Sequence, residues 1–187
     1  MKKAIFLDRD GTIIEERDYI CQLLESEIFH FTCEAVRLMK INHFKVIGIT
    51  NQSSIARGIC TKDQIETIHR EIIGILRKKD AVIDKFYYCP YHPEGSIDEF
   101  TKVSEWRKPA PGMILQAAED FDIDLPESYM MGDDLIDIEA GKNAGCRTVL
   151  VLTGKGRMTR EKLPESNIQP DIISENILTA IKTIIKT

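Results

Sequence analysis

The sequence feature that most constrains the fold is a short apolar run near the start of the chain that ends in two acids and a glycine. Ile5, Phe6 and Leu7 are followed directly by Asp8 and, two residues later, by Asp10. Such a run is typical of a buried strand, and the acids then stand at its carboxyl end. In open parallel sheets, ligands bind just beyond the carboxyl ends of the strands. Asp8 and Asp10 are therefore candidate functional residues.

The rest of the chain alternates apolar strands with amphipathic helices. Strands are predicted at residues 45–50, 84–89, 129–132, 147–152 and 171–173, and helices at 32–42, after 61–64, after 111, at 135–144 and near 177–185. This alternation predicts an α/β fold, a Rossmann-like three-layer αβα sandwich with a central parallel sheet and no large cap domain. The length of 187 residues favours a single domain over residues 1–187.

Two segments have neither a helical nor a strand period. Residues 13–30 are expected to form a short flap or hairpin over the site. Residues 90–111 contain four prolines and are expected to form a long ordered loop, since loops of this length in compact domains are usually functional or disordered. Substrate specificity would rest on these two segments.

Charge and composition exclude several classes of function. The net charge of −5 and the isoelectric point near 5.5 disfavour a nucleic-acid binder, which needs a basic face. The apolar runs are too short for a signal-peptide core or a membrane span. We therefore expect a cytoplasmic protein with no nucleic acid or membrane as partner. A monomer is expected, and an acidic protein can still bind a small phosphorylated ligand, such as a sugar or metabolite, in a local basic pocket.

The five cysteines indicate a reducing compartment. Their number is odd and their spacing irregular, at Cys21, Cys33, Cys60, Cys89 and Cys146. A chain of this length also needs no covalent cross-links to be stable. All five are expected to be thiols.

Polar groups follow two further predicted strands and the long loop. Thr50 begins a run of small polar residues, Asp133 and Asp134 follow the strand at 129–132, and Lys108 lies in the loop. Clustered carboxylates repel one another without a cation, and a hard divalent ion takes oxygen ligands. The sequence thus predicts a Mg²⁺ site at this edge of the sheet.

With Mg²⁺ bound, this set of residues suits phosphoryl transfer. One aspartate can attack phosphorus while the second protonates the leaving oxygen and then activates water. Lys108 and the turn from Thr50 to Ser53 can stabilise the charge on the phosphoryl oxygens. A phosphatase is the predicted enzyme.

These motifs resemble those of haloacid dehalogenase-like phosphatases. The D-x-D-G-T box at Asp8, the hydroxyl of Thr50, Lys108 and the G-D-D-x-x-D run at Gly132 match the four motifs in order. Within that superfamily, F-L-D-R-D-G-T-I, T-N-Q-S, I-A-R-G, Y-Y-C-P, H-P-E-G-S and R-K-P-x-P-G-M resemble the D-glycero-D-manno-heptose 1,7-bisphosphate phosphatase family over residues 3–157. The resemblance implies removal of the C7 phosphate through an aspartyl-phosphate, in nucleotide-activated heptose biosynthesis.

The resemblance also implies roles for individual residues. Asp8 is the nucleophile and Asp10 the general acid and base. Mg²⁺ is bound by Asp8, the main-chain carbonyl of Asp10 and Asp133, with Asp134 adjacent. Thr50, Arg107 and Lys108 complete the catalytic set. Substrate contacts are assigned to Glu16, Arg17, Asp18, Tyr19, Thr50, Asn51, Gln52, Ser53, Arg107, Lys108 and Asp134.

Several side chains near these motifs have roles that the motifs do not define. Gln52 either bonds the backbone of its turn or contacts the ligand. Asp137 lies one helical turn beyond Asp133 and is expected to pair with Lys108. His30, His43 and His69 show no partner pattern and are expected to be surface or packed residues.

The sequence departs from the family at its structural zinc site. The family commonly holds zinc with a C-x-H pair and a C-x-C pair, and of these only Cys89 remains here. Tyr91 takes the second position, and Ser104-Glu105-Trp106 replaces the C-x-C pair. A structural zinc site needs four ligands, so no zinc is expected even if His92 is recruited. Trp106 is expected to pack the loop instead.

Two alternatives remain. Histidinol-phosphate phosphatases share the motifs. A phosphoaspartate receiver, which is a signalling module, also combines acids, a hydroxyl and a lysine on a parallel sheet. A receiver would be phosphorylated once without steady release of phosphate, whereas a phosphatase turns over.

Overall fold

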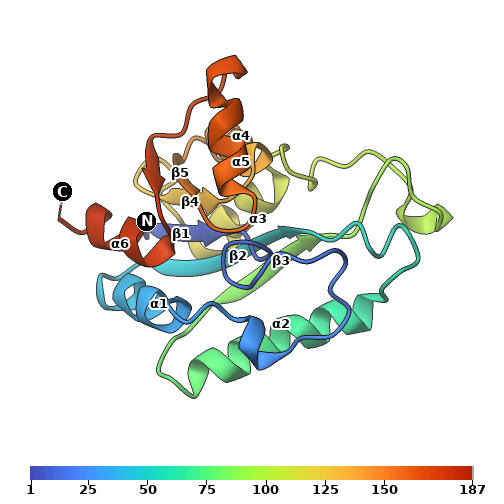
Figure 1. Cartoon of the computed structure of the whole chain (residues 1–187), viewed down its shortest axis with the longest axis horizontal. Helices are drawn as coiled ribbons and strands as arrows, with labels where there is room; N and C mark the ends of the chain where they lie inside the picture. Colours follow the sequence, from blue (N-terminus) through green and yellow to red (C-terminus); the bar gives the residue numbers. More distant parts are fainter. Residues whose placement is uncertain (187) are drawn as a thin grey trace.

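The computed structural model describes residues 1–186, and a six-stranded sheet forms its centre (Figure 1). The strand order is β3-β2-β1-β4-β5-β6, and every neighbouring pair is parallel. The strands are β1 Ala4–Leu7, β2 Lys45–Asn51, β3 Lys85–Cys89, β4 Tyr129–Gly132, β5 Arg147–Val151 and β6 Ile172–Ser174. The predicted α/β class with a central parallel sheet is confirmed.

Helices cover both faces of the sheet. They are α1 Thr32–Ile41, α2 Lys62–Arg77, α3 Gly112–Phe121, α4 Leu135–Ala144, α5 Gly156–Lys162 and α6 Ile177–Ile184, with short 3-10 helices η1 Glu25–Glu27, η2 Asp98–Phe100 and η3 Leu163–Glu165. Residues of α1, α2 and α6 form the core on one face, and residues of α3 and α4 form the core on the other. In Figure 1, α1 and α2 lie below the sheet, and α4 and α5 lie above it. This arrangement is the three-layer sandwich predicted from the alternation of strands and helices.

The alternation of side chains along β1 explains the two cores. Ile5 and Leu7 pack with α1, α2 and α6, whereas Ala4 and Phe6 pack with α3 and α4. All four side chains are fully buried, as expected for a central strand covered on both faces. β1 is therefore held firmly from both sides, and so is the turn that carries Asp8 and Asp10.

A capping box begins α2, the helix predicted after residues 61–64. The Thr61 hydroxyl accepts a hydrogen bond from the Gln64 backbone N–H, and the Gln64 side chain accepts one from the Thr61 N–H. A cap of this kind stabilises a helix by about 1 kcal/mol. It fixes the first turn of the helix whose apolar stripe covers β1 and β2.

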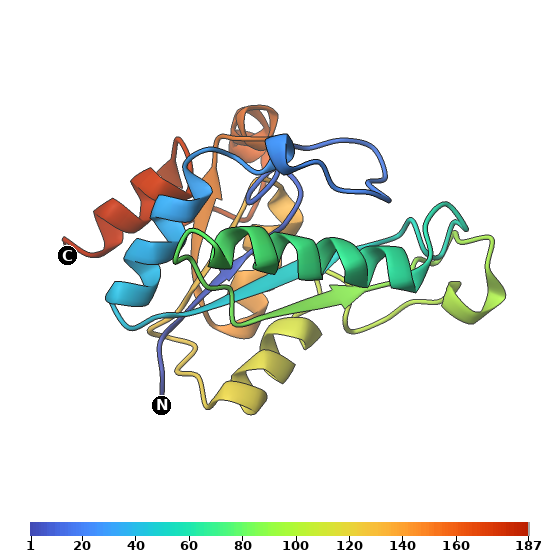
Figure 2. The same cartoon turned by 90° about the horizontal axis from the view of Figure 1, so that it is seen from below.

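Two loops beyond the strand ends differ in detail from the predictions. The segment from residue 13 to 31 contains η1 and single bridges from Ile14 to Asp10 and Ile28, so it is a flap rather than a hairpin of two strands. The loop at residues 90–111 extends past the carboxyl ends of β2 and β3 and contains η2 (Figure 2). The helix α5 was not predicted.

One prediction about the cysteines is wrong. Cys21 in the flap and Cys60 before α2 form a disulfide, with their Cα atoms 5.4 Å apart. The fold brings the flap against the turn after β2, which places two residues separated by 39 positions within bonding reach. Cys33, Cys89 and Cys146 are free thiols, as expected.

Candidate active site

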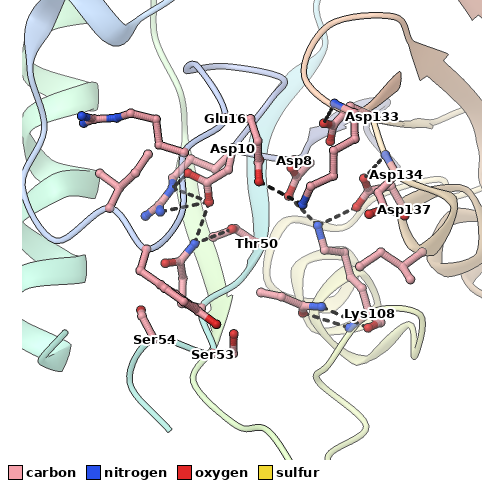
Figure 3. Close-up of a pocket in the computed structure, with 18 of the residues that line it drawn as sticks. Asp8, Asp10, Glu16, Thr50, Ser53, Ser54, Lys108, Asp133, Asp134 and Asp137 are labelled. Carbon is pink, nitrogen blue, oxygen red and sulfur yellow. Dashed lines mark hydrogen bonds and ion pairs between the residues drawn. The ribbon is translucent and has the colours of Figure 1, made fainter. Parts of the chain in front are cut away.

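The carboxyl ends of β1, β2 and β4 lie side by side at one edge of the sheet. β1 pairs with β2 on one side and with β4 on the other, so Asp8, Thr50 and Asp133 reach the same edge (Figure 3). All three side chains are buried. An open cavity of about 280 Å³ lies over them. The three strand ends thus meet in one pocket.

All residues assigned to the site from the sequence line this cavity. They are Asp8, Asp10, Glu16, Arg17, Asp18, Tyr19, Thr50, Asn51, Gln52, Ser53, Arg107, Lys108, Asp133 and Asp134. Arg9, Ser54 and Lys155, which were not predicted as site residues, line it as well. The residues are therefore assembled in one place, and their individual roles stay predictions.

Lys108 is the centre of the buried charge in the pocket. Its Nζ atom donates hydrogen bonds to Asp8 Oδ1 at 2.5 Å, Asp137 Oδ1 at 2.6 Å and the carbonyl oxygen of Ile49 at 3.0 Å. Burial by itself lowers the pKa of Lys108, but the carboxylates of Asp137 and Asp8 outweigh this effect and raise it. Lys108 is therefore a permanent cation. The expected pairing of Asp137 with Lys108 is observed.

Three acids come close enough to share a metal ion. Ligand atoms of Asp8, Asp133 and Asp137 all lie within 4.8 Å of one another. Burial raises the pKa of Asp8 well above its ordinary value, and the nearby Asp137 and Asp133 add to this although Lys108 opposes it. Burial and Asp137 raise the pKa of Asp133 to about 7. A cation bound among these acids would favour their ionised forms.

Asp133 is enclosed by two glycines. Gly11 has φ +80° and Gly154 has φ +50°, both in the left-handed region that favours glycine. A Cβ atom at either position would overlap the Asp133 carboxylate. The turn after β1 and the turn after β5 therefore close around this acid only because neither carries a side chain.

The segment that begins α5 also fixes Asp133. The Lys155 backbone N–H donates to Asp133 Oδ2 at 2.7 Å, and the Thr159 hydroxyl donates to the Asp133 carbonyl oxygen at 2.8 Å. These contacts come from a helix that the sequence did not reveal. They leave the other carboxylate oxygen of Asp133 without a donor among residues 1–186.

Asp10 has partners of a different kind. Arg9 donates to it from Nε at 3.1 and 3.2 Å, and Arg9 Nη2 lies 3.0 Å from Asp10 Oδ2. Gln52 Nε2 donates to Asp10 Oδ2 and to the Thr50 hydroxyl, both at 2.9 Å. Gln52 therefore bonds neighbouring side chains of the site rather than the backbone of its own turn.

Asn51 and Lys108 hold the strand end and the long loop together. Asn51 Nδ2 donates to the Lys108 carbonyl at 3.0 Å, and the Lys108 N–H donates to Asn51 Oδ1 at 3.1 Å. This reciprocal pair fixes the peptide that carries the buried ammonium. Asn51 thus has a positional role in the structure beside its predicted contact with phosphate.

The flap closes one side of the pocket. Glu16 forms an ion pair of 2.9 Å with Lys155, and Arg17 forms one with Glu27 of η1. Tyr19 has φ +50° and is half exposed at the rim of the cavity. The flap is thus tied to the far side of the pocket by the pair Glu16–Lys155, while Tyr19 faces solvent.

The long loop reaches the pocket through Arg107. Its Nη1 atom donates to the carbonyl oxygen of Tyr91 at 3.3 Å, and burial lowers its pKa. Trp106 keeps 37% of its surface exposed, and its ring lies 6.4 Å from that of Tyr87. Trp106 therefore packs the loop only in part.

Comparison with known sequences identifies phosphatases. Residues 105–180 match the family described as HAD-hydrolase-like. The D-glycero-beta-D-manno-heptose-1,7-bisphosphate 7-phosphatase of Escherichia coli (strain K12) is 44% identical over 153 residues, which cover 81% of this chain and 80% of that protein. The D-glycero-D-manno-heptose-1,7-bisphosphate 7-phosphatase of Chlorobaculum tepidum is 36% identical over 188 residues, covering 96% of this chain and 92% of that protein.

A solved structure gives the same result. The D,D-heptose 1,7-bisphosphate phosphatase from B. bronchiseptica, complexed with magnesium and phosphate, matches with a TM-score of 0.83 and 28% identity over 98% of both chains. By sequence and by fold, the chain is a phosphatase that belongs to the heptose-bisphosphate phosphatases of the HAD-like hydrolase family.

Proposed function

We propose that this phosphatase works through an aspartyl-phosphate formed on Asp8. The observation that carries the proposal is the different environment of two acids at one strand end. Asp8 is bound by the buried ammonium of Lys108, whereas Asp10 is bound by Arg9 and Gln52 at the more open side of the pocket. This difference supports Asp8 as the nucleophile and Asp10 as the proton carrier.

Mg²⁺ fits the acids present. Asp8 and Asp133 each use one carboxylate oxygen within the protein, towards Lys108 and Lys155, and keep the other for a ligand. Both oxygens of Asp137 already accept hydrogen bonds. We therefore propose Asp8, Asp133 and the Asp10 main-chain carbonyl as protein ligands. Bound Mg²⁺ would neutralise the carboxylates and draw charge from the phosphoryl oxygens.

Asp134 lies outside the cluster of three acids. It lines the cavity, and its backbone N–H donates to Asp137 Oδ2 at the start of α4. We propose that Asp134 contacts the substrate and lies adjacent to the metal ion.

The chemical steps follow from the placement of the two acids. The Asp8 carboxylate attacks phosphorus, the bond from phosphorus to the sugar oxygen breaks, and Asp10 gives its proton to that oxygen. Asp10 then takes a proton from water, which attacks phosphorus and frees Asp8 and inorganic phosphate. Lys108 and the hydroxyl of Thr50 stabilise the charge on the transferring group.

The proposed substrate is D-glycero-D-manno-heptose 1,7-bisphosphate, with loss of the C7 phosphate. The names of the relatives support this choice, and so do the cationic and polar groups of the flap and loop around the pocket. The test is to compare kcat/KM for this substrate and for histidinol phosphate with Mg²⁺. Activity on neither would reject the substrate while leaving the phosphatase assignment in place. Asp10→Asn should abolish steady release of phosphate.

We further propose that the protein holds no structural zinc. Cys89 bonds the carbonyl of Tyr91, and His92 lies beside Arg57, so the loop offers no set of thiolates and imidazoles for a tetrahedral ion. Elemental analysis of protein purified without chelator should find less than one zinc per ten chains. One zinc per chain would reject the proposal.

A cytoplasmic monomer is the proposed form of the enzyme, with no nucleic-acid or membrane partner. The net charge of −5 argues against binding to nucleic acid. Within residues 1–186, no helix combines the length and apolar character needed to cross a membrane. Light scattering after gel filtration should give a mass near 21.3 kDa, and twice that mass would reject the monomer.

A further inference from the structure

The residue between Asp8 and Asp10 in the sequence is an arginine whose side chain is buried. Arg9 is only 1% exposed and is the largest of the fully buried side chains among the described residues. Burial of a guanidinium is costly unless its N–H groups are paired. The N–H groups of this guanidinium are paired on one side with the Asp10 carboxylate and on the other with His69.

His69 comes from α2, on the face that covers the sheet. Its Nε2 atom lies 3.3 Å from Arg9 Nη1, and its ring stacks on Phe86 with centroids 4.5 Å apart and planes 6° from parallel. Burial, with a further effect of Arg9, lowers the pKa of His69 to about 3. The ring is therefore neutral near pH 7.

The tautomer of His69 follows from its partner. A guanidinium only donates hydrogen bonds, so Nε2 must be the acceptor and the ring proton resides on Nδ1. The ring of Phe86 lies directly over Gly48 of β2, where a Cβ atom would overlap it. The ring can take this position because Gly48 has no side chain. The stack from Gly48 through Phe86 to His69 fixes the acceptor that faces Arg9.

We infer that Arg9 and His69 are positioning residues that hold the Asp10 carboxylate in place for its proton transfers. The inference rests on the proposed function, in which Asp10 is the general acid and base. Arg9 bonds both Asp10 oxygens through Nε, and His69 fixes the rotation of the guanidinium from behind. Gln52 holds Asp10 Oδ2 from the other side. Proton transfer requires such alignment, because small misplacements of a reacting group lower rates steeply.

The test uses His69→Phe, which keeps an aromatic ring on Phe86 and removes the acceptor. The probe is p-nitrophenyl phosphate, whose leaving group needs no proton. Rapid mixing should then show a burst of about one nitrophenol per chain, as in the unaltered protein. Steady turnover needs Asp10 to activate water and should fall about tenfold. This is less than the full contribution of a general base, because Asp10 is still present but misaligned.

Three further variants sharpen the result. Arg9→Lys cannot span both Asp10 and His69 and should also keep the burst and slow turnover. His69→Gln restores an acceptor and should recover at least a third of the turnover rate. His30→Phe, at an exposed position on the flap, is the matched control and should change neither quantity.

The outcomes separate the inference from the proposed function. A full burst with unchanged turnover in His69→Phe would overturn the inference. A smaller burst with an unchanged turnover rate per active chain would also overturn it, because it would show that the variant only folds less completely. Hydrolysis that survives Asp8→Asn would overturn the proposed function instead.

Discussion

The Nζ atom of Lys108 lies 2.5 Å from Oδ1 of Asp8, and both side chains are buried. The two residues come from the long loop and from the end of β1, 100 positions apart in the chain. Their contact is the structural link between the loop and the proposed nucleophile.

Lys108→Met should therefore remove most of the activity. The change leaves Asp8 and Asp137 without their shared cation and removes the charge that faces the transferring phosphoryl group. We expect kcat to fall at least about 100-fold, measured with p-nitrophenyl phosphate and Mg²⁺. Lys102→Met, at an exposed position of the same loop, is the control. A loss of less than fivefold in Lys108→Met would contradict the role given to Lys108.

Mg²⁺ should stabilise the protein through Asp133. A ligand that binds only the folded state raises its stability by about 2.7 kcal/mol at a hundredfold excess over Kd, so Tm should rise as Mg²⁺ is added. Chelation should abolish activity, and renewed Mg²⁺ should restore it. Asp133→Asn should lose the rise in Tm, whereas Asp122→Asn, on the exposed surface, should keep it. An equal rise in both variants would contradict the proposed ligand.

His69 should make the protein less stable as the pH falls. Its folded pKa of about 3 lies below its ordinary value of 6.5, so the unfolded chain binds the proton more readily. The stability is present above pH 6.5 and is lost as the pH falls towards 3. At pH 5 the loss amounts to about 2 kcal/mol.

Urea unfolding at pH 7 and pH 5 measures this effect. His69→Phe lacks the titrating group, so its free energy of unfolding should decrease less between the two pH values than that of the unaltered protein. Equal decreases would show that His69 does not contribute.

The disulfide between Cys21 and Cys60 should stabilise the flap. Closing a loop of this length is worth about 2–4 kcal/mol, so the double variant Cys21→Ser, Cys60→Ser should unfold at lower urea, and a reductant should bring the unaltered protein to the same midpoint. Thiol titration of the unreduced, unfolded protein should find three thiols, in agreement with the three free cysteines. Five would contradict the bond. Since the cytoplasm keeps such pairs reduced, activity should be assayed in both states.

The sequence predicts the parts of the site that follow strand ends. Asp8, Thr50 and Asp133 each end a short apolar run, and parallel strands bring such ends to one edge. Lys108 was a candidate from its place in the long loop, and only its motif gave it a specific role, because no local pattern shows where a loop lysine will point.

The helix α5, the disulfide and the role of His69 were not predicted, because their local sequence patterns are absent or weak. The helix α5 contains Met158 as its one large apolar residue, so it has no apolar stripe to detect. Cys21 and Cys60 meet through the packing of two loops. His69 did leave a signal, since it stands four residues after Ile65 and three before Ile72 on the buried face of α2. A polar residue on such a face needs a partner, and Arg9 is that partner.

The central position of β1 affects when its surroundings can form during synthesis of the chain. Asp8 leaves the ribosome early, whereas both partners of its charge network, Lys108 and Asp137, belong to the second half of the chain. A buried carboxylate without a counter-ion costs several kcal/mol, so the first strand cannot settle into its final surroundings while that half is missing. The charge network that equips the pocket for chemistry is therefore complete only once both Lys108 and Asp137 have been added to the chain.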